Sequence, residues 1–298
     1  MEIHQVPTIE IKDDLLLEKG IKVLIKREDL IHPVVSGNKW RKLKYNLIKA
    51  SHLGHNKLLT FGGAYSNHIA AVAGAGKEEG LKTIGIIRGE EHLPLNSTLA
   101  FASACGMELV YLNRETYRNK TSPKFIAQLE KDHAPFFLIP EGGTNELAIK
   151  GCEEIIASIE KPFDIICCPV GTGGTISGLI SGLEGDKQVL GFSALKGDFL
   201  QNEVASLLEA YRTNYSNWKI NTDYHFGGYA KVKPVLVDFI LNFEKKHGIP
   251  LEPIYTGKML FGIMDLIKKD KFSKGTTILV IHTGGLQGND GFDFRKKR

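Results

Sequence analysis

The chain has 298 residues, of which 42% are hydrophobic and 24% charged, and its formal net charge is +4. These values are ordinary for a soluble globular protein, and no hydrophobic run approaches the roughly 20 residues that a membrane span needs. The length allows two lobes, at about 150 residues per domain. We therefore expect a cytoplasmic protein with no membrane partner.

Two further features of the composition limit the possible partners. Positive charge gathers only at 295–298, which we interpret as a chain end, and so we expect no nucleic-acid partner. The four cysteines, Cys105, Cys152, Cys167 and Cys168, lack metal-ligand spacing. We expect them to be reduced thiols, as in a cytosolic protein, and we expect no metal site.

Strand and helix patterns alternate along the chain. Residues 21–28 read as a strand, and a turn with Pro33 and Gly37 leads to a helix for which Asn38 is the predicted N-cap. The next patterns predict strands at 58–61, 83–87, 108–112 and 136–140, with helices at 69–77, 99–104 and 123–131. A second series predicts strands at 165–170, 188–193 and 276–281, and helices at 176–183, from about 199, at 234–246 and at 257–269, with 213–229 irregular. Such alternation predicts an α/β protein with parallel-rich sheets flanked by helices.

Lys39 lies in the first turn of the predicted helix that begins at Asn38. A lysine charge there opposes the partial positive charge of the helix N-terminus, which favours the neutral amine. A neutral lysine amine attacks carbonyl groups to form a Schiff base. Because Arg41, Lys42 and Lys44 are close by, the octapeptide alone also allows Lys39 to be one more solvated charge.

Four glycine-rich loops follow predicted strands, at 62–68, 141–145, 171–175 and 282–285. Ligands of open parallel sheets bind where strands lead into helices, and glycines let the backbone approach them closely. The third loop consists of Gly171, Thr172, Gly173, Gly174 and Thr175. Its amides would face an anion at a helix N-terminus, so a phosphate is the expected guest. It lacks the Gly-Lys-Ser/Thr of a P-loop and the third glycine of a dinucleotide fingerprint, so a small phosphate-bearing cofactor fits best.

Together with Ser66, Asn67, His68 and the loop at 283–285, these motifs resemble the fold-type II pyridoxal-phosphate enzymes. The best match within that group is the D-cysteine desulfhydrase / 1-aminocyclopropane-1-carboxylate (ACC) deaminase family, and it extends from 26–30 to 282–285. The resemblance implies the two-domain fold of the tryptophan synthase β subunit. We expect a larger domain formed by 1–42 and 154–298, a smaller domain at 43–153, a homodimer, and a small amino-acid substrate.

The resemblance also implies roles for individual residues. Lys39 would carry pyridoxal 5′-phosphate as a Schiff base and act as the base, while Gly171 to Thr175 would hold the phosphate. Asn67 would contact the pyridine 3′-oxygen, Ser66 the substrate carboxylate, and Thr283 the ring nitrogen. Tyr229 and Tyr255 would be the two active-site tyrosines, and His68 would contact the substrate.

Two positions distinguish the activities within this family. Ring-opening members typically carry Glu where this chain has Thr256, and a hydroxyl partner leaves the ring a weaker electron sink that suits loss of a thiolate. The deaminases resemble each other in having Gln at the position of His68, where the desulfhydrases have His. The sequence therefore favours conversion of D-cysteine to pyruvate, hydrogen sulfide and ammonia. ACC deaminase remains the alternative, and a non-catalytic metabolite binder is the alternative of another class.

Overall fold

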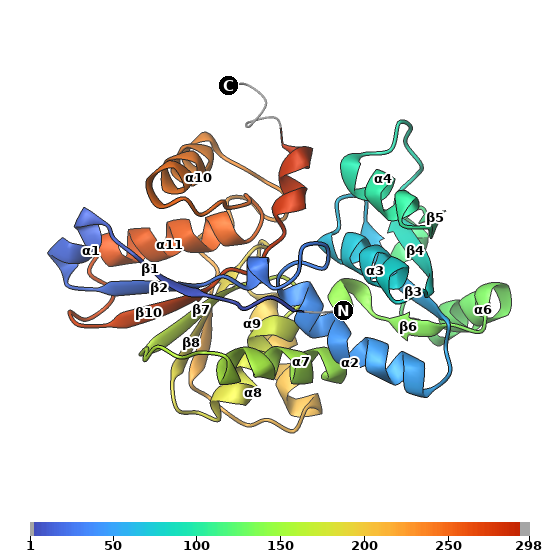
Figure 1. Cartoon of the computed structure of the whole chain (residues 1–298), viewed down its shortest axis with the longest axis horizontal. Coiled ribbons are helices and arrows are strands. Elements are labelled where there is room, and N and C mark those ends of the chain that lie inside the picture. The colour runs from blue at the N-terminus through green and yellow to red at the C-terminus, as the bar shows by residue number, and fades with distance from the viewer. Residues whose placement is uncertain (1–2, 293–298) are drawn as a thin grey trace.

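Two separate β-sheets organise the chain (Figure 1). The computed structural model describes residues 3–292, so the basic segment at 295–298 lies outside the described part. The strands are β1 Thr8–Ile11, β2 Lys22–Lys26, β3 Lys57–Gly63, β4 Lys82–Arg88, β5 Met107–Leu112, β6 Phe137–Ile139, β7 Ile165–Val170, β8 Gln188–Ser193, β9 Trp218–Asn221 and β10 Thr277–Ile281. The helices are α1 Asp14–Lys19, α2 Asn38–His52, α3 Asn67–Glu78, α4 Ser97–Ala104, α5 Arg114–Arg118, α6 Pro123–His133, α7 Glu146–Ala157, α8 Gly174–Leu183, α9 Phe199–Ala210, α10 Pro234–His247 and α11 Thr256–Lys268.

The six-stranded sheet has the order β1-β2-β10-β7-β8-β9, and only β1 runs antiparallel to its neighbour. Helices cover both faces, which is why its central strands are continuously apolar. Successive side chains alternate between faces. Thus Cys167 packs in the core of α10 and α11, while Cys168 packs in the core of α7, α8 and α9.

The four-stranded sheet has the order β5-β4-β3-β6, and all of its strands are parallel. Leu58 and Ile87 face a core shared with α2, α3 and α4. Leu59 and Ile86 face a smaller core closed by Tyr117 and by Leu129 of α6. In Figure 1 this sheet and its helices form the right-hand part of the molecule.

The structure confirms the α/β class and the predicted strands and helices, with shifts of a few residues at their ends. The patterns missed β1, α1, α5 and α7, and they missed β9 inside the segment that was expected to be irregular. The Asn38 cap is wrong, because the N-cap of α2 is Gly37 and no side chain caps it. The division into domains stays a prediction. Its two boundaries, at 42/43 and 153/154, fall within α2 and α7.

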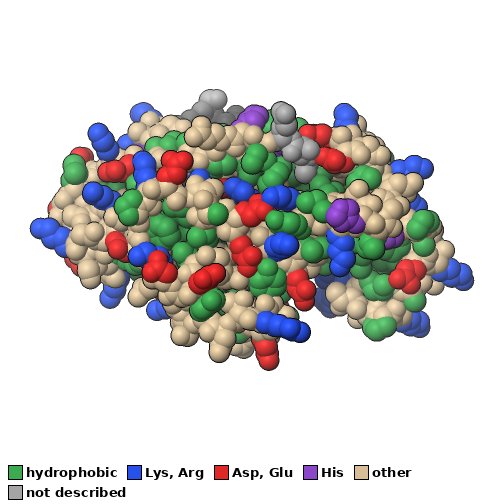
Figure 2. All heavy atoms as spheres, turned by 60° about the horizontal axis from the view of Figure 1, so that its bottom comes forward, with side chains coloured by type: hydrophobic (Ala, Val, Ile, Leu, Met, Phe, Trp, Pro, Cys, Tyr) green, Lys and Arg blue, Asp and Glu red, His purple; other side chains and the backbone are tan. Residues whose placement is uncertain are grey.

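Acidic and basic side chains are interspersed on the face shown in Figure 2. Among residues 3–292, no helix is long and apolar enough to cross a membrane, and no group of three His, Cys, Asp or Glu residues is placed to hold a metal. All four cysteines are free thiols, and three of them are buried.

Candidate active site

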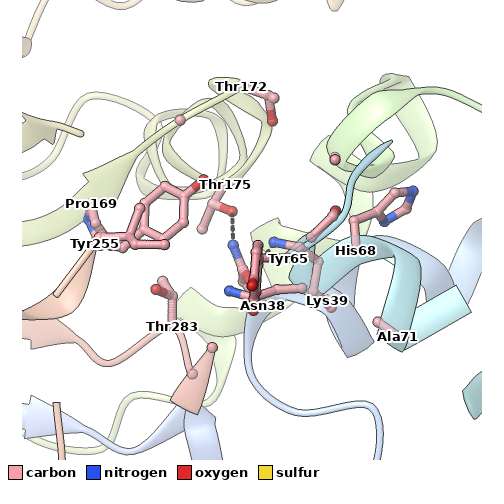
Figure 3. A pocket seen from close by; sticks show the side chains of 18 of the residues that line it. Asn38, Lys39, Tyr65, His68, Ala71, Pro169, Thr172, Thr175, Tyr255 and Thr283 are labelled. Atoms are coloured by element: carbon pink, nitrogen blue, oxygen red, sulfur yellow. Dashed lines mark hydrogen bonds between the residues drawn. The ribbon is translucent and has the colours of Figure 1, made fainter. Parts of the chain in front are cut away.

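A cavity of about 610 Å³ lies between the two sheets. Residues that follow the carboxyl ends of six parallel strands line it, which is where ligands of open α/β sheets bind. The small sheet contributes Gly63 after β3, Arg88 at the end of β4 and Glu141 after β6. The large sheet contributes Gly171 to Thr175 after β7, Leu195 after β8 and Thr283 after β10. Figure 3 shows some of the lining side chains, with Tyr255, Thr175 and Thr283 on one side of the cavity and Lys39 and His68 on the other.

Lys39 projects into this cavity from the first turn of α2. Its Nζ donates to the Oδ1 of Asn38 at 3.0 Å, and the Nδ2 of Asn38 donates to the Oγ1 of Thr175 at 2.7 Å. The turn before the helix lies against Thr283, because a Cβ at Gly37 would stand 1.9 Å from the carbonyl oxygen of Thr283. Gly37 also has a φ of 67°, so glycine is needed there on both counts.

Burial lowers the pKa of Lys39 from 10.5 to about 8. Taking an ammonium out of water disfavours its charged form, and the helix N-terminus acts in the same direction. The sequence argument for a reactive amine at this position thus has a physical counterpart in the structure. A lysine with this pKa has a usable fraction of neutral amine near neutral pH.

Lys42, one helical turn further along, is a site residue that the sequence reasoning left among the solvated charges. Its side chain is 98% removed from solvent, and its Nζ donates to the carbonyl of Gly142 at 2.8 Å and to the hydroxyl of Thr144 at 2.9 Å. Burial and the charge of Lys39 lower its pKa to about 7. The available signal was its spacing, because a residue three positions after Lys39 shares its helix face.

Gly171, Thr172, Gly173, Gly174 and Thr175 form the turn between β7 and α8. Gly173 has a φ of 81° and caps the helix, and a Cβ there would point toward Val204 and Leu207 of α9. A Cβ on Gly174 would instead stand 3.1 Å from the Nζ of Lys42. The open helix N-terminus and the lysine thus meet at one end of the cavity, which suits a phosphate.

Ser66, Asn67 and His68 start α3, a second helix whose N-terminus faces the cavity. Ser66 is the N-cap, and its Oγ accepts from the amide of Ile69 at 3.3 Å. The Oδ1 of Asn67 and the Nδ1 of His68 are buried without a hydrogen-bond partner among the described residues. Since buried polar atoms are normally paired, the unpaired oxygen at the cavity fits a hydrogen bond to a bound ligand.

His68 belongs to the wall of the cavity on the side of β3. Its Nε2 lies 2.7 Å from the hydroxyl of Thr60, and its ring packs beside Gly143. Burial and the charges of Lys39 and Lys42 hold the pKa of His68 well below its ordinary value, so the ring is neutral. It can donate or accept a hydrogen bond there, but it adds no charge.

Tyr229 and Tyr255 lie together on the opposite side, with ring centroids 6.3 Å apart in an edge-to-face arrangement. Tyr255 precedes α11 and reaches into the cavity (Figure 3), with Gly171 close to its ring. Tyr229 is 41% exposed and stands in an irregular loop. Burial raises the pKa of both phenols, so each keeps its proton at neutral pH.

Thr283 lines the cavity, whereas Thr256 is fully buried at the start of α11 and does not line it. The hydroxyl of Thr256 donates to the Oε1 of Glu252 at 3.1 Å. Glu252, which sequence reasoning missed, also accepts from the backbone amides of Ile254 and Tyr255, so its carboxylate caps α11 behind the cavity wall. Among the described residues, Glu141 is the one acidic side chain that lines the cavity.

The arrangement fits one kind of guest. A helix N-terminus with Lys42 suits a phosphate, Lys39 suits a carbonyl carbon, and the unpaired Asn67 suits a polar ring substituent. The cavity has room for such a compound together with a small amino acid, since ligand sites generally measure about 300–1,000 Å³.

Comparisons with known proteins agree with this fit. The sequence profile of the family described as "Pyridoxal-phosphate dependent enzyme" matches residues 3–284. A Pyrococcus horikoshii protein provisionally named 1-aminocyclopropane-1-carboxylate deaminase is 32% identical over 91% of this chain and 86% of its own. The Arabidopsis thaliana bifunctional D-cysteine desulfhydrase/1-aminocyclopropane-1-carboxylate deaminase is 31% identical over 91% of this chain and 74% of its own. A crystal structure of an ACC deaminase homologue superposes with a TM-score of 0.84, at 28% identity, over 98% of this chain and 94% of that one.

Proposed function

Because the chain belongs to the pyridoxal-phosphate dependent enzyme family, we propose that it removes the β-substituent of a small amino acid, with D-cysteine as the preferred substrate. The cofactor is pyridoxal phosphate. The observation that carries the proposal is Lys39, whose amine stands in the cavity between the start of α3 and the loop at 171–175, which we call the phosphate loop. When bound, the cofactor supplies an electron-withdrawing ring that acidifies the α-hydrogen of the substrate.

The residues that would hold the cofactor surround it from both sheets. Gly171 to Thr175 and Lys42 would bind the phosphate, and Asn67 would contact the ring 3′-oxygen. The hydroxyl of Thr283 would donate a hydrogen bond to the ring nitrogen. Asn38 would keep Lys39 and Thr175 in a fixed relation, because it bonds to both.

The remaining residues would handle the substrate and its protons. Lys39 would take the proton from the α-carbon, since its lowered pKa leaves it able to act as a base near neutral pH. Ser66 and the amides at the start of α3 would bind the substrate carboxylate, which a helix N-terminus favours. Tyr229 and Tyr255 would orient the substrate and give a proton to the departing thiolate, since both phenols stay protonated at neutral pH.

The preference for D-cysteine is inferred from the side chains around Thr283, where the ring nitrogen of the cofactor would lie. No acidic side chain lines that part of the cavity among the described residues, and Glu252 behind it is bonded to the amides of α11. A ring nitrogen that bonds to a hydroxyl is not held protonated, so the ring withdraws electrons weakly. Loss of hydrosulfide tolerates a weak electron sink better than cleavage of a carbon–carbon bond does.

ACC deamination to 2-oxobutanoate and ammonia is the second candidate, and the names of the relatives favour it. The test is turnover of D-cysteine, L-cysteine, D-serine and ACC by purified holoenzyme, with sulfide and 2-oxo acid measured separately. We expect sulfide and pyruvate from D-cysteine. Release of 2-oxobutanoate from ACC, with no activity on D-cysteine, would decide for the deaminase.

The same purified protein also tests whether the chain is a non-catalytic binder and not an enzyme of either activity. We expect purified protein to carry the visible absorbance of a lysine-linked cofactor, and protein without this absorbance or any turnover would favour the binder. The homodimer stays a prediction, and light scattering of the eluting protein tests it.

A further inference from the structure

Tyr229 stands in a loop of unusual backbone conformation, which we call the Tyr229 loop (residues 225–231). Four of its residues have positive φ: Phe226 at 55°, Gly227 at 104°, Gly228 at 113° and Ala230 at 55°. Two of these four are not glycine, and such conformations persist only where the surroundings hold them. Phe226 packs edge-to-face on Phe261 of α11 and Gly228 is buried, whereas Tyr229 and Ala230 are exposed.

The side chain of Lys258 contacts this loop. Lys258 is the third residue of α11, its side chain is 99% removed from solvent, and its Nζ donates to the carbonyl of Gly228 at 2.8 Å. The same Nζ lies 3.4 Å from the carbonyl of Ala194, next to the cavity-lining Leu195. One ammonium thus joins two irregular segments that border the cavity.

We propose that Lys258 is a positioning residue that holds the Tyr229 loop over the cavity and so sets the place of the Tyr229 phenol beside Tyr255. The proposal goes beyond the function proposed above, but its kinetic arm rests on the role given there to Tyr229. Lys258 does not line the cavity, so it acts through the loop and not on the substrate.

The chemistry of the contact explains why a lysine serves here. Gly228 already accepts from the amide of Lys231 at 3.1 Å, and its carbonyl has a second lone pair for a further donor. A charged donor makes a stronger bond than a neutral one. Burying the ammonium is costly, as its pKa of about 8 reflects, and the negative charge of Glu252 offsets part of that cost. At a core position with only a structural role, an apolar side chain would cost less free energy to bury than a lysine does.

Hydrogen exchange of the holoenzyme tests the positioning without any substrate. Lys258→Met removes the donor and keeps the length of the side chain. We expect the amides of Gly227, Gly228 and Lys231 to exchange about tenfold faster or more. Exchange elsewhere should be unchanged, because the contact reaches only the loop and Ala194.

Lys26→Met is the matched control. Lys26 is equally buried, and its Nζ also donates to two backbone carbonyls, those of Val6 and Ser158, but it does not line the cavity or touch the loop. Loop exchange that is equally fast in both variants, or unchanged in Lys258→Met, overturns the proposal. Lys258→Gln serves as a second variant. Failure of both Lys258 variants to fold also overturns it, because the proposal confines the effect to the loop.

A double-mutant cycle with Tyr229→Ala adds the catalytic consequence. If Lys258 acts through Tyr229, then Lys258→Met lowers kcat more than it changes KM, and it has no further effect once Tyr229 is removed. Equal losses in both backgrounds would show a general structural role and overturn the proposal. If Tyr229→Ala keeps full turnover, the catalytic role of Tyr229 fails, whereas the exchange result still decides on Lys258.

Discussion

The Oδ1 of Asn38 accepts a hydrogen bond from the Nζ of Lys39 at 3.0 Å, and this contact joins the Lys39 amine to the residue that precedes it in the chain. Because the other end of the Asn38 amide donates to Thr175, the amine and the phosphate loop keep a fixed separation. Asn38 was predicted as a helix cap, but its side chain is used in the site instead. Because Gly37 is the N-cap of α2, the side chain of Asn38 is free to bond to Lys39 and Thr175 in the candidate site.

Lys39→Ala should lower turnover by roughly 10²–10⁴-fold or abolish it, since Lys39 is the residue proposed both as the covalent link and as the base. The protein should still fold and bind free cofactor through the phosphate loop, which circular dichroism and cofactor titration would show. Lys44→Ala is the control, because Lys44 lies on the same helix with its Nζ on Glu154 at 2.6 Å. Turnover of Lys39→Ala within tenfold of wild type would contradict the assignment.

The covalent attachment of cofactor to the apoprotein should depend on pH through Lys39. Its pKa is lowered from 10.5 to about 8, so the neutral amine accumulates as the pH rises through 8 and not only above 10. The attachment rate, measured by borohydride trapping, should rise with pH and level off above about pH 9. A rate that is still rising steeply near the ordinary lysine pKa would show that burial does not tune this amine.

Lys42→Met should weaken cofactor binding by about ten- to a hundredfold, because in the proposed site Lys42 would give the phosphate a charge-assisted bond. Gly174→Ala should weaken it as well, since the new Cβ would stand 3.1 Å from the Nζ of Lys42. Cofactor retained after dialysis is the measurement, and Lys26→Met is the control for loss of a buried lysine. Full retention in both site variants would place the phosphate elsewhere.

Thr283→Val should mainly lower kcat, whereas Thr256→Val should mainly lower the stability of the fold. Thr283 lines the cavity, so its loss should lower kcat about fivefold or more with little change in thermal stability. Thr256 bonds to buried Glu252 and does not line the cavity, so its loss should cost about 1–3 kcal/mol of stability and change kcat less. The reverse pattern, from melting curves and steady-state kinetics, would remove Thr283 as the ring-nitrogen partner.

Most of the strands and helices could be predicted because they are buried parallel strands and two-faced helices, whose apolar patterns are strong. Strand β9 was missed because its four residues, Trp218–Asn221, form an edge with only one fully buried side chain, Ile220. Helix α7 packs closely on α2 and α8, and its buried residues Ala148, Ile149, Cys152 and Ile155 lie at helical spacing, so the sequence held a helical pattern there that was overlooked.

In the site, the glycine loops and Lys39 could be predicted because their chemistry is visible in a few adjacent letters. Glu252 and Lys258 could not, since charged residues usually lie at the surface and nothing local marks them as buried, and Lys42 was marked only by its spacing from Lys39. Their burial depends on carbonyls and amides from distant segments, such as Gly142 for Lys42 and Gly228 for Lys258. Only the folded chain brings these partners together.

The pairing of β2 with β10 places an early strand beside the last one, and Gly37 in contact with Thr283. During synthesis on the ribosome, the segment with Lys39 emerges long before the segment that completes its surroundings. The cofactor therefore cannot find its full site on a nascent chain until β10 and the loop after it have left the exit tunnel. We expect cofactor capture to follow the emergence of β10, and a chain that ends before β10 to stay without cofactor.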